Sequence, residues 1–142
     1  IVWAINPKND SLDNLAAYIL QFAQEYLENT GIDSRFDFPE NIPDVPLQSD
    51  VRHNIFLTVK ESLNNILKHS GASEVSIDLK MNSQRAEFII RDNGKGIDFD
   101  HVDKFSNGLS NMRKRIEDIN GEILIESDKG TRIKLSIPID KN

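Results

Sequence analysis

Three segments of the chain carry apolar residues at the spacing of one helix face. In residues 12–29 these positions are Leu12, Leu15, Ile19, Phe22, Ala23 and Tyr26. The segment from 49 or 50 to 69 has the same period, as does the shorter segment 108–119. Side chains three and four positions apart share one side of an α-helix, so this pattern predicts three amphipathic helices. A glycine follows each of them and predicts its end: Gly31, Gly71 and Gly121.

Other segments alternate between apolar and polar residues, which is the period of a half-buried β-strand. They are residues 35–38, 74–81, 86–91, 122–127 and 132–137. Residues 39–46 hold three prolines and predict an extended connector. The element order is therefore α-β-α-β-β-α-β-β. This order predicts an α+β fold, a two-layer α/β sandwich with a mixed, mostly antiparallel sheet and helices on one face.

The composition is typical of one soluble domain. The 142 residues suffice for a hydrophobic core, and no apolar run approaches the roughly 20 residues that span a bilayer. The 23 acidic and 17 basic residues give a net charge of −6, which argues against nucleic-acid binding and against direct membrane contact. Because the chain has no cysteine, disulfides and thiolate metal sites are excluded, and we expect a cytoplasmic domain. The chain begins without a start methionine, so we expect a fragment of a longer protein.

The stretch Asp92-Asn93-Gly94-Lys95-Gly96 has two interpretations. Asn-Gly after a strand is a strong signal for a hairpin turn. Two glycines close together also allow the backbone to approach a ligand closely. The stretch alone does not decide between a turn and a binding loop.

The second predicted helix has two faces of different chemistry. Its core face holds Ile55, Phe56, Val59, Leu63, Ile66 and Leu67, and its polar face holds Asn54, Thr58, Glu61, Asn65 and Lys68. A solvated surface is the ordinary explanation of such a polar face. The alternative is a site for a metal-bound polyphosphate, because Mg²⁺ prefers oxygen ligands and shares them with phosphates. Asn65 would then supply a ligand, Lys68 would balance charge, and Glu61 would act as a general base.

Four segments in order carry a family resemblance: "ESLNNILKHS", "RDNGKGID", "NGLSNMRKRI" and "KGTRIKLSIP". They resemble the N, G1 and G2 boxes and the closing Gly-Thr of GHKL (Bergerat-fold) ATP-binding domains. The closest similarity is to the catalytic and ATP-binding domain of bacterial two-component sensor histidine kinases. The short interval between the G1 and G2 boxes resembles the short-lid subfamily, which is paired with helix-turn-helix response regulators. On this resemblance residues 11–142 form the catalytic domain, and residues 1–10 form a junction from a dimerisation helix bundle.

The resemblance implies ATP and Mg²⁺ as cofactors and assigns roles at the N box. Glu61 matches the residue that helps to polarise the accepting histidine, and Asn65 matches the Mg²⁺ ligand. Lys68 and His69 match residues near the phosphates.

The resemblance also assigns roles at the other boxes. Asp92 matches the acceptor of a hydrogen bond from the adenine amino group, and Gly94 and Gly96 let the backbone pass close to the base. The remaining nucleotide-binding positions are Asn107, Gly108, Leu109 and Met112 of the G2 box, and Thr131 beside adenine. Independently of the resemblance, a helix that begins at Asn107-Gly108 would offer free backbone N–H groups to phosphate.

The implied activity is transfer of the γ-phosphoryl group of ATP to a histidine. None of His53, His69 and His101 precedes an acidic residue on a dimerisation helix, so we expect the acceptor outside this chain. The implied partners are the kinase's own dimerisation helices, in a homodimer, and a cognate response regulator. One departure from the subfamily pattern is Ser106, which stands where the G2 box often has its first glycine.

Three alternatives to a histidine kinase stay open. The chain could be a nucleotide-responsive interaction module without phosphotransfer, although Glu61, Asn65 and Asp92 argue against degeneracy. It could be a serine kinase of the anti-sigma-factor type, which shares the boxes, although the junction-like residues 1–10 argue against that. It could also be an ordinary α/β domain without a ligand.

Overall fold

The computed structural model describes residues 11–96, 106–127 and 129–139, with the backbone alone at 106 and 107. Its helices and strands are α2 (Leu12–Leu27), β1 (Asp33–Asp37), α3 (Ser49–Asn65), β2 (Glu74–Met81), β3 (Arg85–Asp92), α4 (Ser106–Glu117), β4 (Glu122–Ser127) and β5 (Thr131–Pro138). All eight predicted elements are present. The junction expected at residues 1–10 and the third histidine, His101, lie outside the described residues.

The five strands form one mixed sheet in the order β1-β2-β3-β5-β4. β1 and β2 are parallel, and the other neighbouring pairs are antiparallel, which confirms the predicted mostly antiparallel sheet. Parallel neighbours need a long crossover, and α3 lies in the connection from β1 to β2. In the sheet β5 lies between β3 and β4, so the first residue of β5 lies beside the last residue of β3.

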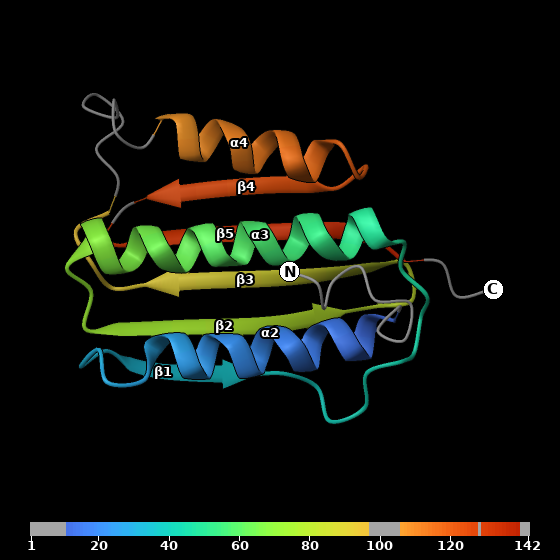
Figure 1. Cartoon of the computed structure of the whole chain (residues 1–142), viewed down its shortest axis with the longest axis horizontal. Helices are drawn as coiled ribbons and strands as arrows, with labels where there is room; N and C mark the ends of the chain where they lie inside the picture. Colours follow the sequence, from blue (N-terminus) through green and yellow to red (C-terminus); the bar gives the residue numbers. More distant parts are fainter. Residues whose placement is uncertain (1–10, 97–105, 128, 140–142) are drawn as a thin grey trace.

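The three helices cover one face of this sheet (Figure 1), as the two-layer prediction required. The core lies between the two layers, where sheet residues such as Ile77, Phe88 and Leu135 are completely or almost completely buried. From the helix layer, Ile19 and Ile55 contribute side chains with no exposed surface. Among the described helices, none is long and apolar enough to cross a membrane.

Helix α3 departs from the expected two-faced pattern in two places, of which the first is around Thr58. Thr58, predicted on the polar face, is fully buried and donates a hydrogen bond to the Asn54 carbonyl at 2.8 Å. The Asn54 side chain in turn donates to the Arg115 carbonyl of α4 at 2.9 Å. This part of the polar face is therefore a contact between helices rather than a solvated surface.

At its carboxyl end α3 widens into a π turn, residues Ile66–Ser70. A π turn holds an extra residue, so side chains after it are rotated relative to the α-helical pattern. This rotation explains why Leu67, predicted in the core, is 36% exposed. The turn ends at Gly71, which has the left-handed conformation expected of a residue that closes a helix.

Candidate functional site

A pocket of about 420 Å³, counting its open mouth, lies between the helix layer and the ends of β3 and β5. Its lining comes from the second half of α3, the π turn, the two strand ends and the first turn of α4. The lining residues are Ser62, Asn65, Ile66, His69, Ser70, Ile90, Asp92, Gly96, Leu109, Thr131 and Ile133. Several apolar side chains with a few polar groups are typical of a small-molecule site.

Asp92 supplies a carboxyl group on the sheet side of the pocket. It is the last residue of β3, and it pairs with Thr131, the first residue of β5. The Gly94 amide donates to its Oδ1 at 2.8 Å. Burial raises the pKa of the Asp92 carboxyl, while backbone hydrogen bonds to Gly94 and Thr131 act in the opposite direction. A carboxylate with two backbone donors is held in one orientation and can still accept a hydrogen bond from a ligand.

The residues after Asp92 do not form a hairpin turn. Their hydrogen bonds join the end of β3 to the last residue of the π turn and to the residues that follow it. The Lys95 amide donates to the Ser70 carbonyl at 2.9 Å, and the Asn93 side chain accepts from the Ser73 and Glu74 amides, each at 2.9 Å. The hairpin interpretation is wrong because β4, the next strand in sequence, is not a neighbour of β3.

Gly94 lies in the tightest part of this contact. A Cβ atom there would come within 2.4 Å of the Ser70 carbonyl oxygen and 2.7 Å of the Ser70 Cβ. Gly94 does not line the pocket, whereas Gly96, at φ +80°, does. Of the two glycines predicted to approach a base, Gly94 is therefore shown to approach the protein's own backbone.

On the helix side, Asn65 and His69 line the pocket together. They are four residues apart, one at the end of α3 and the other in the π turn. Lys68 is exposed and is not part of the lining. Glu61, one turn before Asn65, lies just beyond the pocket.

Helix α4 packs its first turn against Glu61 and Asn65. A Cβ atom at Gly108 would lie 2.9 Å from Glu61 Oε1 and 4.0 Å from Asn65 Nδ2. Gly108 is the third residue of α4, so its amide is among those that have no partner within the helix. The free amides and the positive end of the helix dipole therefore lie next to a carboxamide and a carboxylate.

Two other predicted residues of α4 have separate roles. Leu109 lines the pocket, but Met112 is fully buried and receives a weak hydrogen bond from the Ser62 hydroxyl at 3.5 Å. Met112 thus supports the pocket from behind. The side chain of Asn107 lies outside the described residues.

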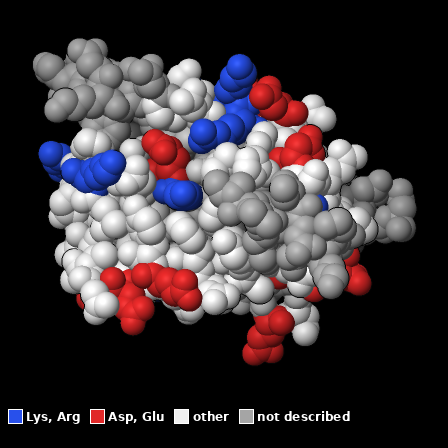
Figure 2. All heavy atoms as spheres, in the orientation of Figure 1, with Lys and Arg blue, Asp and Glu red and all other residues white. Residues whose placement is uncertain are grey.

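A second hollow of about 550 Å³, counting its open mouth, lies on the outer side of Glu61. It is lined by Tyr26, Leu57, Lys60, Glu61, Asn64 and Arg115. The Tyr26 hydroxyl donates to Asn64 Oδ1 at 3.2 Å. Its pKa is raised by burial and, to a smaller extent, by the negative charge of Glu61. On the helix-covered face, basic and acidic side chains lie together in the upper half of the view, and acidic side chains alone lie along its lower edge (Figure 2).

The comparison with known families decides the classification. Residues 50–141 match the family described as histidine kinase-, DNA gyrase B-, and HSP90-like ATPases. The chain belongs to this ATPase family. Membership identifies an ATP-binding domain, and the matched residues include every described residue that lines the pocket.

The similar proteins within this ATPase family are sensor histidine kinases. The chain is 32% identical over 123 residues to the sensor histidine kinase LiaS of Bacillus subtilis, covering 85% of this chain and 33% of LiaS. It is 34% identical over 113 residues to the histidine-protein kinase/phosphatase UhpB of Salmonella typhimurium, covering 79% of this chain and 22% of UhpB. The chain thus spans a third or less of the length of these relatives.

The fold agrees with this membership. The histidine kinase domain of a blue-light activated kinase from Erythrobacter litoralis superposes with a TM-score of 0.73 at 20% identity, covering 88% of this chain and 61% of that domain. The predicted GHKL sandwich is thereby confirmed.

Sequence reasoning missed five lining residues: Ser62, Ile66, Ser70, Ile90 and Ile133. Periodicity contains a signal for most of them. Ser62 and Ile66 share a helix face at a spacing of four residues. Ile90 lies two positions before Asp92, and Ile133 lies two positions after Thr131, so each shares its neighbour's face of the sheet. The motifs had named the residues with family roles and left out the rest of the lining, of which Ile66, Ile90 and Ile133 are apolar.

The donor atoms are compatible with a Mg²⁺ ion that is shared with a ligand. Among the residues that the structure describes, no group of three or more His, Asp or Glu side chains could hold a metal ion. Asn65 offers a single carboxamide oxygen at the pocket. Mg²⁺ commonly binds in this way, with one or two protein ligands, several waters and the phosphates of a nucleotide.

Proposed function

We propose that this chain is the Mg-ATP-binding catalytic domain of a sensor histidine kinase and transfers the γ-phosphoryl group of ATP to a histidine. The observation that carries the proposal is the pocket, with the Asp92 carboxylate on its sheet side and Asn65 beside the start of α4 on its helix side. Membership of the ATPase family and the similarity to sensor histidine kinases support it.

The base of ATP would bind on the sheet side of the pocket. Asp92 accepts a hydrogen bond from the adenine amino group, and its two backbone donors keep the carboxylate in place. Ile90 and Ile133 provide an apolar surface for the ring. Thr131, directly opposite Asp92 in the sheet, completes this side. A carboxylate acceptor favours a base with an exocyclic amino group over one with a carbonyl at that position.

The phosphates would bind on the helix side. The first-turn amides of α4 and the helix dipole attract negative charge, and His69 lies on the same side of the pocket. Asn65 is the residue that would hold Mg²⁺ through its carboxamide oxygen. When bound, Mg²⁺ neutralises part of the phosphate charge. Lys68, exposed at the edge, would balance charge from outside the lining.

Glu61 would act on the acceptor histidine. It lies between the phosphate side of the pocket and the hollow bounded by Tyr26 and Arg115. An acceptor imidazole entering this hollow would reach Glu61, which orients the ring and takes up its proton. The imidazole nitrogen then forms a bond to the γ-phosphorus, and the bond to the bridging oxygen breaks to release ADP. Positioning and charge neutralisation carry most of such a reaction.

The acceptor histidine would be on a dimerisation helix outside this chain, in a homodimer of the longer protein. The phosphoryl group would pass from it to an aspartate of a cognate response regulator. His53 and His69 are unsuitable acceptors, because His53 belongs to the first turns of α3 and His69 lines the nucleotide pocket itself.

The test is autophosphorylation of the longer protein with γ-labelled ATP, using Asn65→Asp and Glu61→Gln. The matched control is Asn64→Asp, which makes the same change on the next residue and keeps the acceptor for Tyr26. We expect Asn65→Asp to lose at least tenfold in labelling and in Mg²⁺-dependent nucleotide binding. Glu61→Gln should lose labelling while keeping nucleotide affinity, and Asn64→Asp should keep both.

The chemistry of the label separates the remaining interpretations. A phosphohistidine label is lost in acid, whereas a phosphoserine label survives and would indicate a serine kinase. Nucleotide binding without any label would contradict the proposed transfer. Asn65→Asp labelling as well as the wild type would contradict the role of Asn65.

A further inference from the structure

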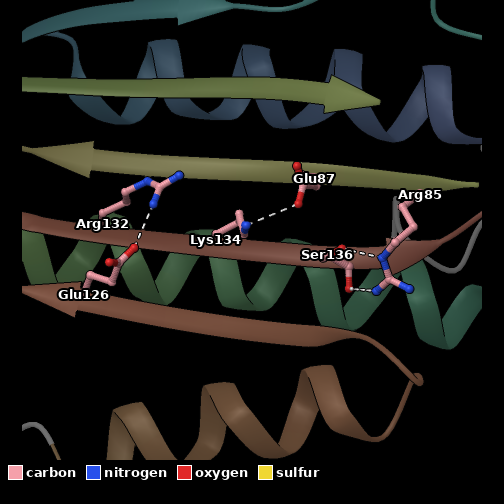
Figure 3. A network of polar contacts seen from close by, with 6 residues as sticks. All are labelled: Arg85, Glu87, Glu126, Arg132, Lys134 and Ser136. Carbon is pink, nitrogen blue, oxygen red and sulfur yellow. Dashed lines mark hydrogen bonds and ion pairs between the residues drawn. The ribbon is translucent and has the colours of Figure 1, made fainter. Parts of the chain in front are cut away.

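The face of the sheet opposite to the helices carries a regular set of charged side chains (Figure 3). Three of the basic side chains on β3 and β5 have partners. Arg132 pairs with Glu126 at 2.7 Å, Lys134 with Glu87 at 3.5 Å, and the Arg85 side chain donates to Ser136 Oγ at 2.7 Å. This part of the open face therefore needs no other ligand.

One cross-strand row of this face is different. The strand register places Arg35, Ser76, Arg91 and Arg132 side by side on β1, β2, β3 and β5. Arg91 thus stands directly opposite Arg132, and like charges at such positions are destabilising. Arg132 has Glu126 as its partner. In the parts of the chain that the structure describes, Arg35 and Arg91 have no hydrogen bond or ion pair through their side chains.

The surface is hollowed where these two arginines lie. A depression of about 500 Å³, counting its open mouth, is lined by Arg35, Glu74, Val75, Ser76, Arg91, Asp92 and Asn93. Ser76 is short, and it lies between two long side chains on strands about 10 Å apart. The two guanidinium groups can therefore reach one small anion held above the Ser76 hydroxyl.

A second depression adjoins the first through Arg91 and is lined also by Lys129 and Arg132. The two depressions together contain four cationic side chains. Three acidic residues, Glu74, Asp92 and Glu126, also line them, and Glu126 is already paired with Arg132. The row is therefore locally positive in a chain whose net charge is −6.

We propose that Arg35, Ser76 and Arg91 bind the phosphate dianion of a phosphate monoester or of inorganic phosphate. Each planar guanidinium can donate two parallel hydrogen bonds to phosphate oxygens, and Ser76 supplies a further donor. The two guanidinium groups attract a dianion more strongly than a singly charged carboxylate, so a phosphate dianion has the advantage. The site lies behind the nucleotide pocket, because Arg91 and Asp92 are consecutive residues of β3 facing opposite sides of the sheet.

Amide and arginine side-chain NMR signals of the 142-residue chain test this proposal. The probes are inorganic phosphate, O-phosphoserine and acetate, each titrated at constant ionic strength. We expect both phosphates to shift the signals of Arg35, Ser76 and Arg91 until the shifts saturate. Acetate should need an at least tenfold higher concentration to produce the same shifts. Arg91→Gln and Arg35→Gln should each weaken phosphate binding about tenfold or more. Lys80→Gln, at the far end of β2 on the same face, is the matched control and should leave it unchanged.

Comparison of O-phosphoserine with inorganic phosphate distinguishes a phosphorylated group on a larger molecule from the free phosphate ion. Tighter binding of O-phosphoserine would indicate a phosphorylated group on a larger molecule, and equal or tighter binding of inorganic phosphate would indicate the free ion. Shifts confined to Asn65, His69 and Leu109, or an equal response to acetate, would overturn the proposal. Its outcome is independent of phosphotransfer, because none of Arg35, Ser76 and Arg91 lines the nucleotide pocket.

Discussion

The two sides of the pocket differ in what holds them in place. The sheet side is the paired end of β3 and β5, where backbone hydrogen bonds fix Asp92 and Thr131 opposite each other. The helix side is built from side chains on separate elements, with Gly108 of α4 resting on Glu61 and Asn65 of α3. The sheet side should therefore tolerate changes of neighbouring side chains, whereas the helix side should respond to a single added atom.

The largest effect should come from removing the charged acceptor on the sheet side. We expect Asp92→Asn to weaken binding of an ATP analogue about a hundredfold, because a buried site built around one hydrogen bond loses that much without it. Calorimetric titration measures it. Inosine triphosphate, which has a carbonyl in place of the amino group, is the control ligand. It should bind the wild type poorly and should be affected far less by the substitution. An unchanged preference for ATP in the variant would contradict the role of Asp92.

The next largest effect concerns the contact between Gly94 and Ser70, which joins the sheet side of the pocket to the helix side. Gly94→Ala places a Cβ atom 2.4 Å from the Ser70 carbonyl oxygen, so the loop or the π turn has to move. Overpacking of this kind costs about 1–3 kcal/mol of unfolding free energy, measured by urea denaturation.

The matched control is Gly71→Ala, where φ is +65° and no atom lies within 4 Å of the added Cβ. Its cost should be only the backbone strain, about 1 kcal/mol. Equal losses for the two variants would show that the contact with Ser70 is unimportant.

On the helix side, Gly108→Ala should separate activity from stability. The added Cβ lies 2.9 Å from Glu61 Oε1, the end of a side chain that can rotate away. Alanine is the better helix former by about 1 kcal/mol, so unfolding free energy should stay constant or rise. Phosphotransfer in the longer protein should nevertheless fall about tenfold as Glu61 is displaced. Asn111→Ala, on the exposed side of α4, should leave both unchanged.

The smallest effect is a pH dependence on the sheet side. The folded-state pKa of Asp92 is raised above its ordinary value of 3.8, chiefly by burial, so the ionised carboxylate destabilises the folded domain. The stability associated with the neutral form is present below pH 3.8 and is lost as pH rises through the folded-state pKa. Asp92→Asn should therefore raise the melting temperature of the nucleotide-free domain at pH 7, by no more than a few degrees.

This difference should shrink as pH falls through the same range. Thermal melts of both proteins across that range measure it. A variant that melts below the wild type at neutral pH would show that the two backbone donors outweigh burial.

Local sequence patterns predicted the elements, and the motifs named four of the six polar residues that line the pocket, but not Ser62 and Ser70. Asn65 and His69 share a helix end, and Asp92 ends a strand, so period and motif were enough to select them. The strand order is a different matter. Because β5 lies between β3 and β4 in the sheet, Thr131 pairs with Asp92, which is 39 residues earlier in the chain. Only the order of the four boxes indicated that these two residues lie together.

Contacts between distant segments explain two of the failures, and a local change of helix type explains the third. Thr58 looked solvated because α4, which contacts this part of α3 through Asn54, comes about 50 residues later in the chain. Leu67 looked buried because the pattern assumed an α-helix where the backbone widens into a π turn. The contact of Gly94 with Ser70 arises from two loops that only the sheet brings together.

The π turn makes the tolerance of deletions uneven along this helix. A chain with one residue fewer between Ile66 and Ser70 can close the turn as a regular α-helix, because the widened turn holds one extra residue. The residues after the turn then keep their places, and the Ser70 carbonyl still meets the Lys95 amide. A deletion earlier in α3 instead rotates the residues between it and the turn by about 100°. Deletions within these five residues should therefore be tolerated better than deletions earlier in the helix.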